Sequence, residues 1–457
     1  MTRYDAIVIG SGQAGNPLSQ NLADQGWSVA LIEKEHLGGT CVNTGCTPTK
    51  TMVASAQVAH YARHAGQWGV HAGAVNVDLA EVVARKDRVV NQSRSGLERK
   101  VAVQKNLRLY RGSARFVAPH RIRVNQEEIE GERIFINTGA RPNIPTLEGL
   151  DRIGYLTNAS IMELRELPAH LLVLGGGYVG LEFGQMFRRF GCEVTIVHRD
   201  DQLLPKEDSD VAQELQKALE KEGIRILLST KSTGVEKKDG QIILNLERNG
   251  KASTVTGSHL LIATGRRPNT DDLGLDAAGV QLNPKGFIKV NGRLETNVPG
   301  IWALGDANGG PAFTHISYND YQIVYANLIE GKNLSTDHRL VPYAVFTDPQ
   351  LGRVGMTEKE ARKAGDKLKV GKIPVAHVAR AIERDETAGL MKVVVDAKTD
   401  KILGAAILSS EGGELVQIIS FVMLAGAPYT LMKGAIYIHP ILAEGFWTLM
   451  DQVKPVD

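Results

Sequence analysis

Short apolar runs that end in glycine-rich turns recur along the chain, and two of them share one pattern. Residues 6–15 (AIVIGSGQAG) and 171–180 (LLVLGGGYVG) each place an apolar strand directly before a Gly-x-Gly-x-x-Gly turn. Each turn is followed by a helical segment and a second apolar strand, NPLSQNLADQG with SVALIEKE and LEFGQMFRRFG with EVTIVHRD. Because the glycines stand twice in the same context, the pattern predicts two βαβ units that bind dinucleotides.

The remaining strands predict that the second unit is inserted into the first. IFINTGARPN (134–143) and LLIATGRRPN (260–269) are matching strands downstream of the two units. The strand at 297–307 (NVPGIWALGDA) has no nucleotide turn of its own, so we assign it to the first unit. From about residue 340 the pattern becomes a strand hairpin, LMKVVVDAKTDKILGAAILSS, and a helix, GGELVQIISFVMLAG, which are typical of an α+β domain.

We therefore predict an α/β fold with two nested Rossmann-like domains and a C-terminal α+β domain. The expected boundaries are residues 1–145 and 271–338 for the two parts of the first domain, 146–270 for the second and 339–457 for the third. A chain of 457 residues suits this division, since single cores seldom grow beyond about 250–300 residues.

Composition excludes several classes of function. The 53 basic and 51 acidic residues leave a formal charge of +2, which gives no reason to expect a nucleic-acid or membrane partner. Three cysteines are too few for the disulfide framework of a secreted protein, and no signal peptide precedes the first strand, so we expect a cytoplasmic protein. The apolar runs are much shorter than the ~20 residues of a membrane span.

The first nucleotide site carries an acidic residue at the expected place. Glu33 stands 18 residues after Gly15, at the end of the second strand, where a carboxylate binds a free ribose 2′-hydroxyl. The turns themselves hold a pyrophosphate at a helix N-terminus. Their glycines are Gly10, Gly12 and Gly15 in the first unit and Gly175, Gly177 and Gly180 in the second.

The second nucleotide site lacks this carboxylate. The same count from its third glycine reaches His198, which is followed by Arg199. Such a pair suits a 2′-phosphate, so NADPH is expected in preference to NADH, with Lys206 as a further contact. Asp200 and Asp201 act against this preference.

Two cysteines, Cys41 and Cys46, lie close together in a stretch whose glycines and proline predict a loop, GGTCVNTGCTPTK (38–50). A zinc site would need further ligands, and none stand nearby, so no metal site is predicted. Cys192 lies in an apolar context and is expected to be a buried core residue. A start of the next helix near Cys46 would favour its thiolate. In a chain with two dinucleotide units, we interpret the pair as a redox disulfide.

The stretch 38–50 resembles the active site of the class I pyridine nucleotide-disulfide oxidoreductases, the family of glutathione reductase, lipoamide dehydrogenase and mercuric reductase. The resemblance extends over the chain through both glycine turns, both TGxRPN segments, ALGDA and IHPILAE. Residues 381–414 and FTHISYNDY are most similar to the mercuric reductase-like branch, which also contains bacterial hypothiocyanous acid reductases. The family resemblance implies FAD in the first unit and a homodimer.

The resemblance also assigns roles along an electron path from NADPH to the flavin. Tyr178 matches the aromatic flap that moves aside for the nicotinamide. Lys50 and Glu182 match an ion pair beside the flavin ring, and Asp306 in ALGDA matches the carboxylate that bonds the ribityl chain. Cofactor contacts in the two TGxRPN segments are implied for Thr138, Gly139, Gly265 and Arg266.

Roles in thiol chemistry follow in the same way. Cys46 is implied to be the thiolate that faces the flavin, and Cys41 the thiol that exchanges with substrate. His439 and Glu444 match a C-terminal dyad in which the carboxylate orients the imidazole, and which reaches the partner subunit's cysteines. His315 has no role that the sequence assigns.

Departures from the family patterns bear on the substrate. No cysteine follows Cys192, so the C-terminal pair with which mercuric reductase captures Hg(II) is absent. The first helix, NPLSQNLADQG, lacks the basic side chains with which glutathione reductase binds its charged substrate. His198 and Arg199, in place of an acidic residue, disfavour lipoamide dehydrogenase, which works with NAD. The resulting hypothesis is an NADPH-dependent reductase of a small disulfide, thiol-reactive oxidant or metal ion.

Three alternatives stay open at this point. The chain could be a dihydrolipoamide dehydrogenase bound to a multienzyme complex, or a glutathione reductase-like reductase of low-molecular-weight disulfides. It could also be a flavin diaphorase or quinone reductase whose cysteines take no part. The sequence does not name the physiological electron acceptor.

Overall fold

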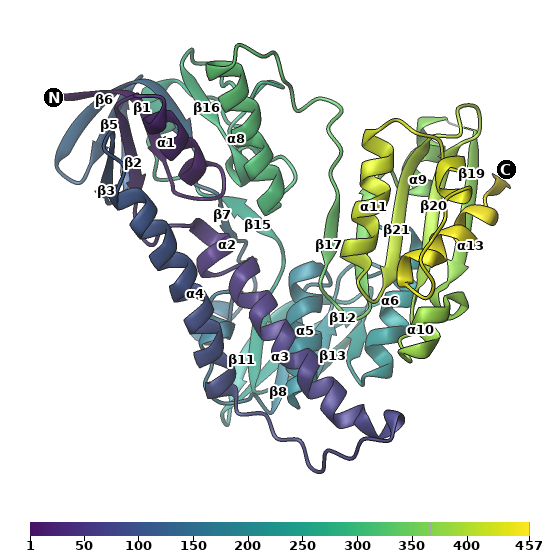
Figure 1. The fold of residues 1–457 in the computed structure, drawn as a ribbon. Coiled ribbons are helices and arrows are strands. Elements are labelled where there is room, and N and C mark those ends of the chain that lie inside the picture. Colours follow the sequence, from purple (N-terminus) through teal and green to yellow (C-terminus); the bar gives the residue numbers. More distant parts are fainter. Residues whose placement is uncertain (366, 457) are drawn as a thin grey trace.

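The first of three lobes is built on a largely parallel sheet (Figure 1). The computed structural model describes residues 1–365 and 367–456. The strands run in the order β3 (Leu107–Arg111), β2 (Val29–Glu33), β1 (Thr2–Ile9), β6 (Glu127–Ile136), β5 (Arg121–Val124) and β4 (Ala114–Ala118), with β16 (Ile301–Ala303) on β6. The helix α1 (Gly15–Asp24) crosses from β1 to β2, which are parallel, so the predicted first βαβ unit is confirmed. The assignment of β16 to this unit is confirmed as well.

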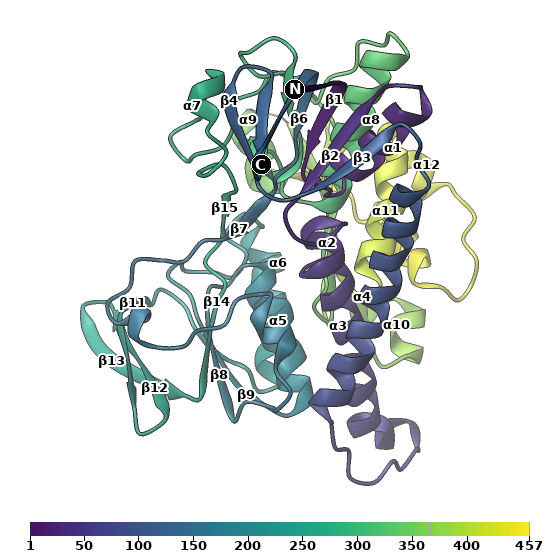
Figure 2. The same cartoon turned by 90° about the vertical axis from the view of Figure 1, so that its left-hand side faces the viewer.

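The second lobe repeats the unit on a smaller parallel sheet. Its order is β10 (Arg225–Leu227), β9 (Glu193–Val197), β8 (His170–Leu174) and β14 (His259–Ile262). The helices α5 (Tyr178–Phe190) and α6 (Ser209–Lys221) connect these strands. A separate antiparallel sheet of β11 (Lys231–Lys238), β12 (Gln241–Arg248) and β13 (Lys251–Gly257) stands at the outer edge of this lobe (Figure 2).

The two TGxRPN segments form the connection between these lobes. They fold as β7 (Ala140–Pro142) and β15 (Arg266–Pro268), which pair with each other antiparallel. The chain leaves the first lobe through β7 and returns through β15. The insertion of the second nucleotide unit into the first, predicted from the order of strands, is therefore confirmed.

The third lobe is an antiparallel sheet covered by helices. Its strands run in the order β17 (Tyr343–Val345), β18 (Gln350–Gly355), β21 (Ile402–Ser409), β20 (Leu390–Asp396), β19 (Leu368–Pro374) and β22 (Lys454–Val456). The predicted hairpin is β20 with β21, and the predicted helix is α11 (Gly412–Leu424). Buried Leu415, Val416 and Ile419 seat α11 on the sheet, whereas Phe421 and Leu424 are exposed. The α+β character of this region is thus confirmed.

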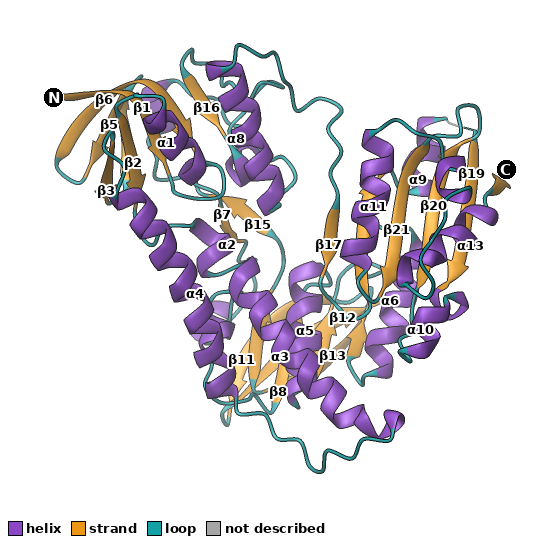
Figure 3. Cartoon of the chain, viewed as in Figure 1, coloured by secondary structure: helices purple, strands orange, loops and turns teal. Residues whose placement is uncertain are grey.

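Helices near the cysteines differ from the sequence expectation in one respect. The stretch expected as a loop contains a short helix, α2 (Gly39–Asn43). The left-handed turn falls at its start, at Gly38 with φ 99° and Gly39 with φ 59°, and the chain bends again at Gly45, after its end. The long helix α3 (Cys46–His64) starts directly at Cys46, and α4 (Leu79–Ala102) packs beside it (Figure 3). The bend between α2 and α3 brings the two cysteines together.

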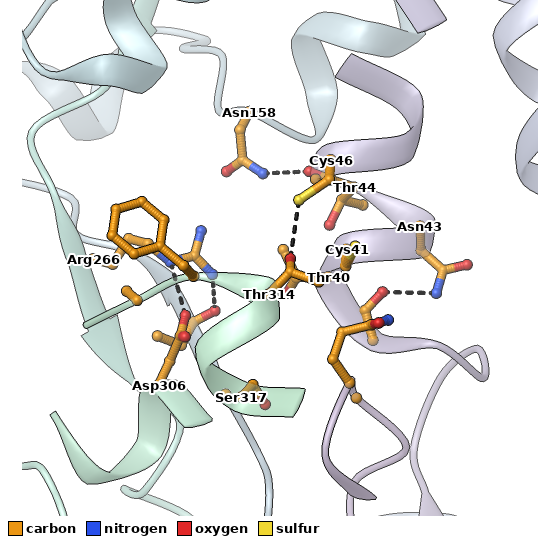
Figure 4. A pocket seen from close by; sticks show the side chains of 18 of the residues that line it. Thr40, Cys41, Asn43, Thr44, Cys46, Asn158, Arg266, Asp306, Thr314 and Ser317 are labelled. Atoms are coloured by element: carbon orange, nitrogen blue, oxygen red, sulfur yellow. Dashed lines mark hydrogen bonds and ion pairs between the residues drawn. The ribbon is translucent and has the colours of Figure 1, made fainter. Parts of the chain in front are cut away.

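The remaining helices complete the three lobes. They are α7 (Leu275–Ala278), α8 (Thr314–Ile329), α9 (Glu358–Ala364), α10 (Ala379–Glu383), α12 (Thr430–Lys433) and α13 (Gly445–Asp451). Of these, α8 matters most for the site, since its N-terminus points toward α2 and α3 (Figure 4). Among the described helices, none has both the length and the apolar character that a membrane crossing requires.

Candidate active site

A cavity of about 1420 Å³ lies where the first lobe meets the other two (Figure 4). It gathers predicted site residues from distant parts of the chain: Gly10, Gly12, Glu33, Cys41, Cys46, Lys50, Thr138, Gly139, Tyr178, Glu182, Arg266 and Asp306. The other predicted residues lie outside its lining: Gly15, Gly175, Gly177, Gly180, His198, Arg199, Gly265, His439 and Glu444. The cysteines and the first nucleotide turn therefore share one space.

Both glycine turns pack a helix start directly against the turn. A Cβ atom at Gly15 would lie 2.0 Å from the carbonyl oxygen of Gly10, and one at Gly180 would lie 2.1 Å from that of Gly175. Any larger side chain would push the helix away from the turn. The close packing leaves the N-termini of α1 and α5 open to phosphate oxygens, as a dinucleotide site requires.

Asn137 joins three segments around the cavity, and the sequence reasoning missed it. Its Oδ1 accepts the N–H of Gly15 at 2.9 Å, and its Nδ2 donates to the carbonyl oxygen of Leu304 at 2.9 Å and to Ser317 Oγ at 3.4 Å. The adjacent buried Thr138 hydroxyl lacks a hydrogen-bond partner within the described part of the chain. A buried polar atom left unpaired on a cavity wall fits a bound cofactor that supplies its partner.

Glu33 and His198 hold equivalent positions at the two nucleotide turns. Glu33 Oε2 accepts the backbone N–H of Ser11 at 3.0 Å, and His198 Nδ1 accepts the N–H of Gly176 at 3.1 Å. The imidazole therefore replaces the carboxylate as the acceptor that fixes the turn. This bond requires the neutral tautomer with the proton on Nε2.

The positive charge beside the second turn belongs to Arg199. Burial lowers the pKa of His198, which keeps the ring uncharged, and its Nε2 lies 3.4 Å from Asp200 Oδ2. The Arg199 side chain is 82% exposed, and its Nε lies 3.5 Å from Asp200 Oδ1. A 2′-phosphate would thus meet one exposed guanidinium whose charge Asp200 partly offsets.

The two cysteines are free thiols with different acidities. Cys46 Sγ lies 3.0 Å from the hydroxyl oxygen of Thr314 at the start of α8 (Figure 4). A hydrogen bond from Cys41, together with Thr314 and the charge of Lys50, outweighs burial and lowers the pKa of Cys46 to about 6. The same bond raises the pKa of Cys41. In the reduced form, Cys46 therefore carries the negative charge and Cys41 the proton.

The third cysteine behaves as the sequence predicted. Cys192 is fully buried in the core of the second lobe. Burial raises the pKa of its thiol to about 12. It is therefore neither accessible nor reactive.

Lys50 and Glu182 form an ion pair behind Cys46. Lys50 Nζ lies 2.7 Å from Glu182 Oε2 and 4.5 Å from the centre of the Phe346 ring. Glu182 Oε1 also accepts the backbone N–H of Phe346 at 2.9 Å. The carboxylate is buried, and each of its oxygens has a partner, so the lysine is held in one place on the cavity wall.

A row of aromatic rings connects the three lobes beside the cavity. Tyr178 lies 6.2 Å from Phe313, and Phe313 is stacked at 5.0 Å on Tyr343, measured between ring centres. The Tyr343 hydroxyl donates to Glu207 in the second lobe, and Glu207 pairs with Arg353 of the third lobe at 2.9 Å. Tyr343 therefore links the second lobe, through Glu207, to the start of α8, through Phe313.

Arg266 reaches from the second TGxRPN segment into the cavity of the first lobe. Its Nε lies 3.6 Å from Asp306 Oδ2, and its guanidinium donates to the carbonyl oxygen of Ala140. Burial raises the pKa of Asp306 despite the nearby charge of Arg266. These groups offer both a donor and an acceptor to a ligand.

The C-terminal dyad is formed but stands apart from the cysteines in this chain. His439 Nδ1 lies 3.0 Å from Glu444 Oε2 and 3.1 Å from Oε1. When the Nδ1 N–H donates a hydrogen bond to this carboxylate, Nε2 is the ring nitrogen that can accept a proton from a substrate or thiol. The His439 side chain is 67% exposed, and large apolar residues near it, Ile436, Ile438 and Trp447, are exposed as well.

Comparisons with known proteins agree over nearly the whole chain. Residues 4–320 match the family described as pyridine nucleotide-disulphide oxidoreductase, and residues 341–450 match its dimerisation domain. The chain belongs to the pyridine nucleotide-disulfide oxidoreductases. As expected from the resemblance, it carries the FAD- and NAD(P)-binding domains of the family and a C-terminal dimerisation domain, and it is an oxidoreductase that uses FAD and NAD(P)H.

Individual oxidoreductases of this family are similar along their full length. A probable pyridine nucleotide-disulfide oxidoreductase of Escherichia coli, RclA, is 39% identical and aligns with 99% of this chain and 100% of its own. A dihydrolipoyl dehydrogenase of Thermus scotoductus is 39% identical over 97% of this chain and 96% of its own. A mercuric reductase of Lysinibacillus sphaericus is 34% identical over 97% of this chain and 81% of its own.

Solved structures of this oxidoreductase family share the fold. The HOCl-induced flavoprotein disulfide reductase RclA from Escherichia coli superposes with a TM-score of 0.90 at 39% identity, covering 99% of this chain and 100% of that one. Its Cu(II) complex gives a TM-score of 0.91. The prediction of an FAD-containing disulfide oxidoreductase is confirmed at the level of the family.

Proposed function

We propose that this oxidoreductase passes two electrons from NADPH to the Cys41–Cys46 disulfide, and from there to a small disulfide or thiol-reactive oxidant. The observation that carries the proposal is the pairing of a thiolate and a thiol in the cavity that holds the first nucleotide turn. Cys46 at the start of α3 holds the charge, and Cys41 holds the proton. Bound FAD would accept the hydride and reduce the disulfide.

The proposed thiol chemistry uses residues of both subunits. Cys41 loses its proton to His439 of the partner subunit and attacks a substrate disulfide, which breaks the S–S bond and releases one thiolate. That thiolate takes the proton from His439 of the partner subunit and leaves as a thiol. Cys46 then attacks the Cys41 sulfur, the internal disulfide forms again, and the second half of the substrate leaves. Each turnover thus consumes the two electrons supplied by one NADPH.

A homodimer with a shared site is supported by the position of the dyad. His439 and Glu444 are outside the lining of the cavity, yet they are bonded to each other and surrounded by exposed apolar side chains. Such a surface is typical of one that a second copy covers. We also propose a cytoplasmic setting, in which reducing conditions keep the cysteine pair available for turnover.

Charges around the cavity support a substrate without strong negative charge. The ten residues of α1 include neither lysine nor arginine; Gln20 lies on this helix and Gln13 lies just before it. Glu411 and Glu414 line the cavity from the third lobe. Carboxylates repel anionic disulfides such as glutathione disulfide. The similar structure from Escherichia coli is that of an HOCl-induced flavoprotein disulfide reductase, which supports an oxidant as substrate here.

A second candidate is dihydrolipoamide dehydrogenase. It is favoured by the 39% identity to the Thermus scotoductus enzyme. It is also favoured because the positive charge of Arg199, beside the second turn, is partly offset by Asp200, which weakens the preference for a 2′-phosphate. Strong NADH preference together with rapid turnover of lipoamide would support this candidate over the first. The quinone reductase alternative requires turnover that does not depend on the cysteines.

Anaerobic titration with NADPH tests the proposal. We expect a long-wavelength band, from the Cys46 thiolate donating into oxidised flavin, after two-electron reduction of the wild type. Cys46→Ser should lack this band. Cys41→Ser has no disulfide to take up electrons, so it should show the band before NADPH is added, lose it as NADPH reduces the flavin, and lose substrate turnover by at least about 100-fold. Full turnover by Cys41→Ser would refute the proposal.

Stopped-flow reoxidation of the reduced enzyme then identifies the acceptor. The panel contains lipoamide, glutathione disulfide, bacillithiol and mycothiol disulfides, Hg(II) and hypothiocyanite. We expect fastest reoxidation by an uncharged or electrophilic oxidant and slowest by glutathione disulfide. Efficient reoxidation by glutathione disulfide would contradict the charge argument.

A further inference from the structure

Thr314 is the one hydroxyl group that the described residues bring into contact with the redox cysteines. Its Oγ1 lies 3.0 Å from Cys46 Sγ, and its side chain points from the first turn of α8 toward the start of α3 (Figure 4). When Cys46 is a thiolate it has no proton to donate, so the hydroxyl must be the donor in this bond. Hydrogen bonds to a charged acceptor are among the stronger ones in proteins.

We propose that Thr314 is a catalytic residue of the thiol half-reaction, a role that rests on the function proposed above. Its hydroxyl donates to the Cys46 thiolate from the reduction of the internal disulfide until that disulfide closes again. It becomes the main side-chain donor to that thiolate once Cys41 has bonded to substrate.

The local structure gives the Thr314 hydroxyl no other task. Thr314 is the first residue of α8, but the N-cap is Phe313, and no side chain caps this helix. Within the described part of the chain, the hydroxyl contacts the two redox cysteines: Cys46 Sγ at 3.0 Å, and Cys41, whose pKa a hydrogen bond from Thr314 acts to lower. A threonine that served only to start the helix would not need to direct its hydroxyl at a sulfur atom.

Two contacts fix the first turn of α8 where the hydroxyl needs to be. The Phe313 ring is stacked on Tyr343, with 5.0 Å between ring centres and 13° between planes. His315 Nε2 lies 2.6 Å from the carbonyl oxygen of Pro342, and the His315 ring is nearly parallel to Phe313. Thr314 therefore sits between two anchored neighbours. Held in this way, it loses little side-chain entropy when it bonds to the thiolate.

The need for this donor arises from the chemistry of the mixed disulfide. In the two-electron reduced enzyme, the Cys41 thiol is the strongest influence that lowers the pKa of Cys46, and Thr314 adds to it. When Cys41 forms its bond to a substrate sulfur, its proton has left and it can no longer donate. The Cys46 thiolate must persist until it attacks the Cys41 sulfur and closes the disulfide. Thr314 keeps it ionised and aimed during that interval.

The test uses a chain in which Cys41 can donate nothing. Cys41→Ala leaves Cys46 as the accessible thiol, since Cys192 is fully buried. In this background we compare Thr314 with Thr314→Val, which has nearly the same shape without the hydroxyl, and with Thr314→Ser, which keeps it. Thr40→Val is the matched control: Thr40 lines the same cavity but bonds to neither sulfur in the described structure.

Two readouts follow the ionisation of Cys46 in each holoenzyme. One is the pH dependence of the thiolate-to-flavin absorbance band, and the other is the pH dependence of alkylation by iodoacetamide. We expect Thr314→Val to move both midpoints upward by about one to two pH units, because a hydrogen bond to a charged group is lost. Thr314→Ser should restore the original midpoint, and Thr40→Val should leave it unchanged.

The outcomes separate this inference from the proposed function. An unchanged midpoint in Thr314→Val would overturn the role of Thr314 while the band itself still supported the thiol function. An equal shift in Thr314→Val and Thr314→Ser would overturn it as well, since it would indicate a structural effect. If Cys41→Ala alone gives no band at any pH, the function proposed for the cysteine pair fails first.

Discussion

Lys50 Nζ lies 2.7 Å from Glu182 Oε2, so a positive and a negative charge stand side by side behind Cys46. The two charges act on the cysteine in opposite directions. Lys50 lowers the pKa of Cys46, and Glu182 raises it. The pair therefore balances the acidity of the thiol from a position that also faces the cofactor cavity.

This balance predicts shifts of opposite sign when one charge is removed. Lys50→Met should raise the pKa of Cys46 and Glu182→Gln should lower it, each by about half a unit to one unit. The measurement is the pH dependence of the thiolate-to-flavin band. Lys50→Arg is the control that keeps the charge and should stay near the wild type. Shifts in the same direction for both neutral variants would contradict the electrostatic account.

The dyad predicts complementation between two inactive chains. His439→Ala should lose about 10²–10⁴-fold in turnover, because it removes the proton acceptor for Cys41, while FAD content is retained. A mixed dimer of a Cys46→Ser chain with a His439→Ala chain should regain one of its two sites. Statistical mixing should therefore restore roughly a quarter of wild-type activity.

The contrary result for the dyad is equally specific. If mixed dimers stay inactive, each chain uses its own histidine, and the shared site is wrong. Glu444→Gln provides a graded variant, since an amide can still bond to His439 Nδ1 but carries no charge. We expect its turnover to fall between those of wild type and His439→Ala.

The second nucleotide turn predicts that coenzyme choice can be reversed at one position. His198→Glu copies the arrangement at Glu33, where a carboxylate accepts the turn N–H and remains available to a ribose. We expect the ratio of kcat/KM for NADPH to that for NADH to fall about 10-fold or more. Arg199→Met should lower kcat/KM for NADPH and leave NADH almost unaffected. Equal losses for both coenzymes would indicate a damaged turn instead.

Five histidines with lowered pKa values predict that the folded state becomes less stable as the pH falls. Burial lowers the pKa of His60, His170, His198, His259 and His315 below the ordinary value of 6.5. Below 6.5 the unfolded chain therefore binds protons that the folded chain does not, so stability rises with pH through this window and declines as pH falls through it. The Tm measured from about pH 8 down to about pH 5.5 should decline.

One histidine offers a clean check of this pH dependence. The side-chain oxygen of His198→Asn can still accept the N–H of Gly176 but cannot titrate, so its Tm should fall less steeply with acid than that of the wild type. His71→Asn, at an exposed histidine, serves as the control. An identical slope in His198→Asn and wild type would contradict the assignment of a neutral ring.

Much of the fold was readable from the sequence because local patterns carried it. Apolar strands before the glycine turns, and the order of the strands, predicted the nesting of the two nucleotide units. The short helix Gly39–Asn43 was missed. The glycines around it indicated a loop, and nothing in the local sequence predicted that these five residues form a helical turn.

Residues of the site that act through long-range contacts could not be predicted. Thr314, Phe346 and Asn137 come next to Cys46, Lys50 and Gly15 only in the folded chain. Asn137 gave one usable signal: it is an amide at the end of an otherwise apolar strand. His198 was predicted from its distance along the chain after the third glycine of the second turn. Its bond to Gly176 depends on the orientation of the ring, which the sequence does not give. Because this bond requires a neutral ring, the positive charge available to a 2′-phosphate is that of Arg199.

The paired strands β7 and β15 have a consequence for building chimeras. Ala140 lies opposite Pro268, and Pro142 lies opposite Arg266, so the inserted coenzyme unit is attached through a closed two-stranded stem. A donor unit from a relative with a different coenzyme would fit this host only if both stem strands were transplanted together. Junctions placed just outside Ala140 and Pro268 would exchange the unit as one piece, and the segment with the two cysteines would remain that of the host chain.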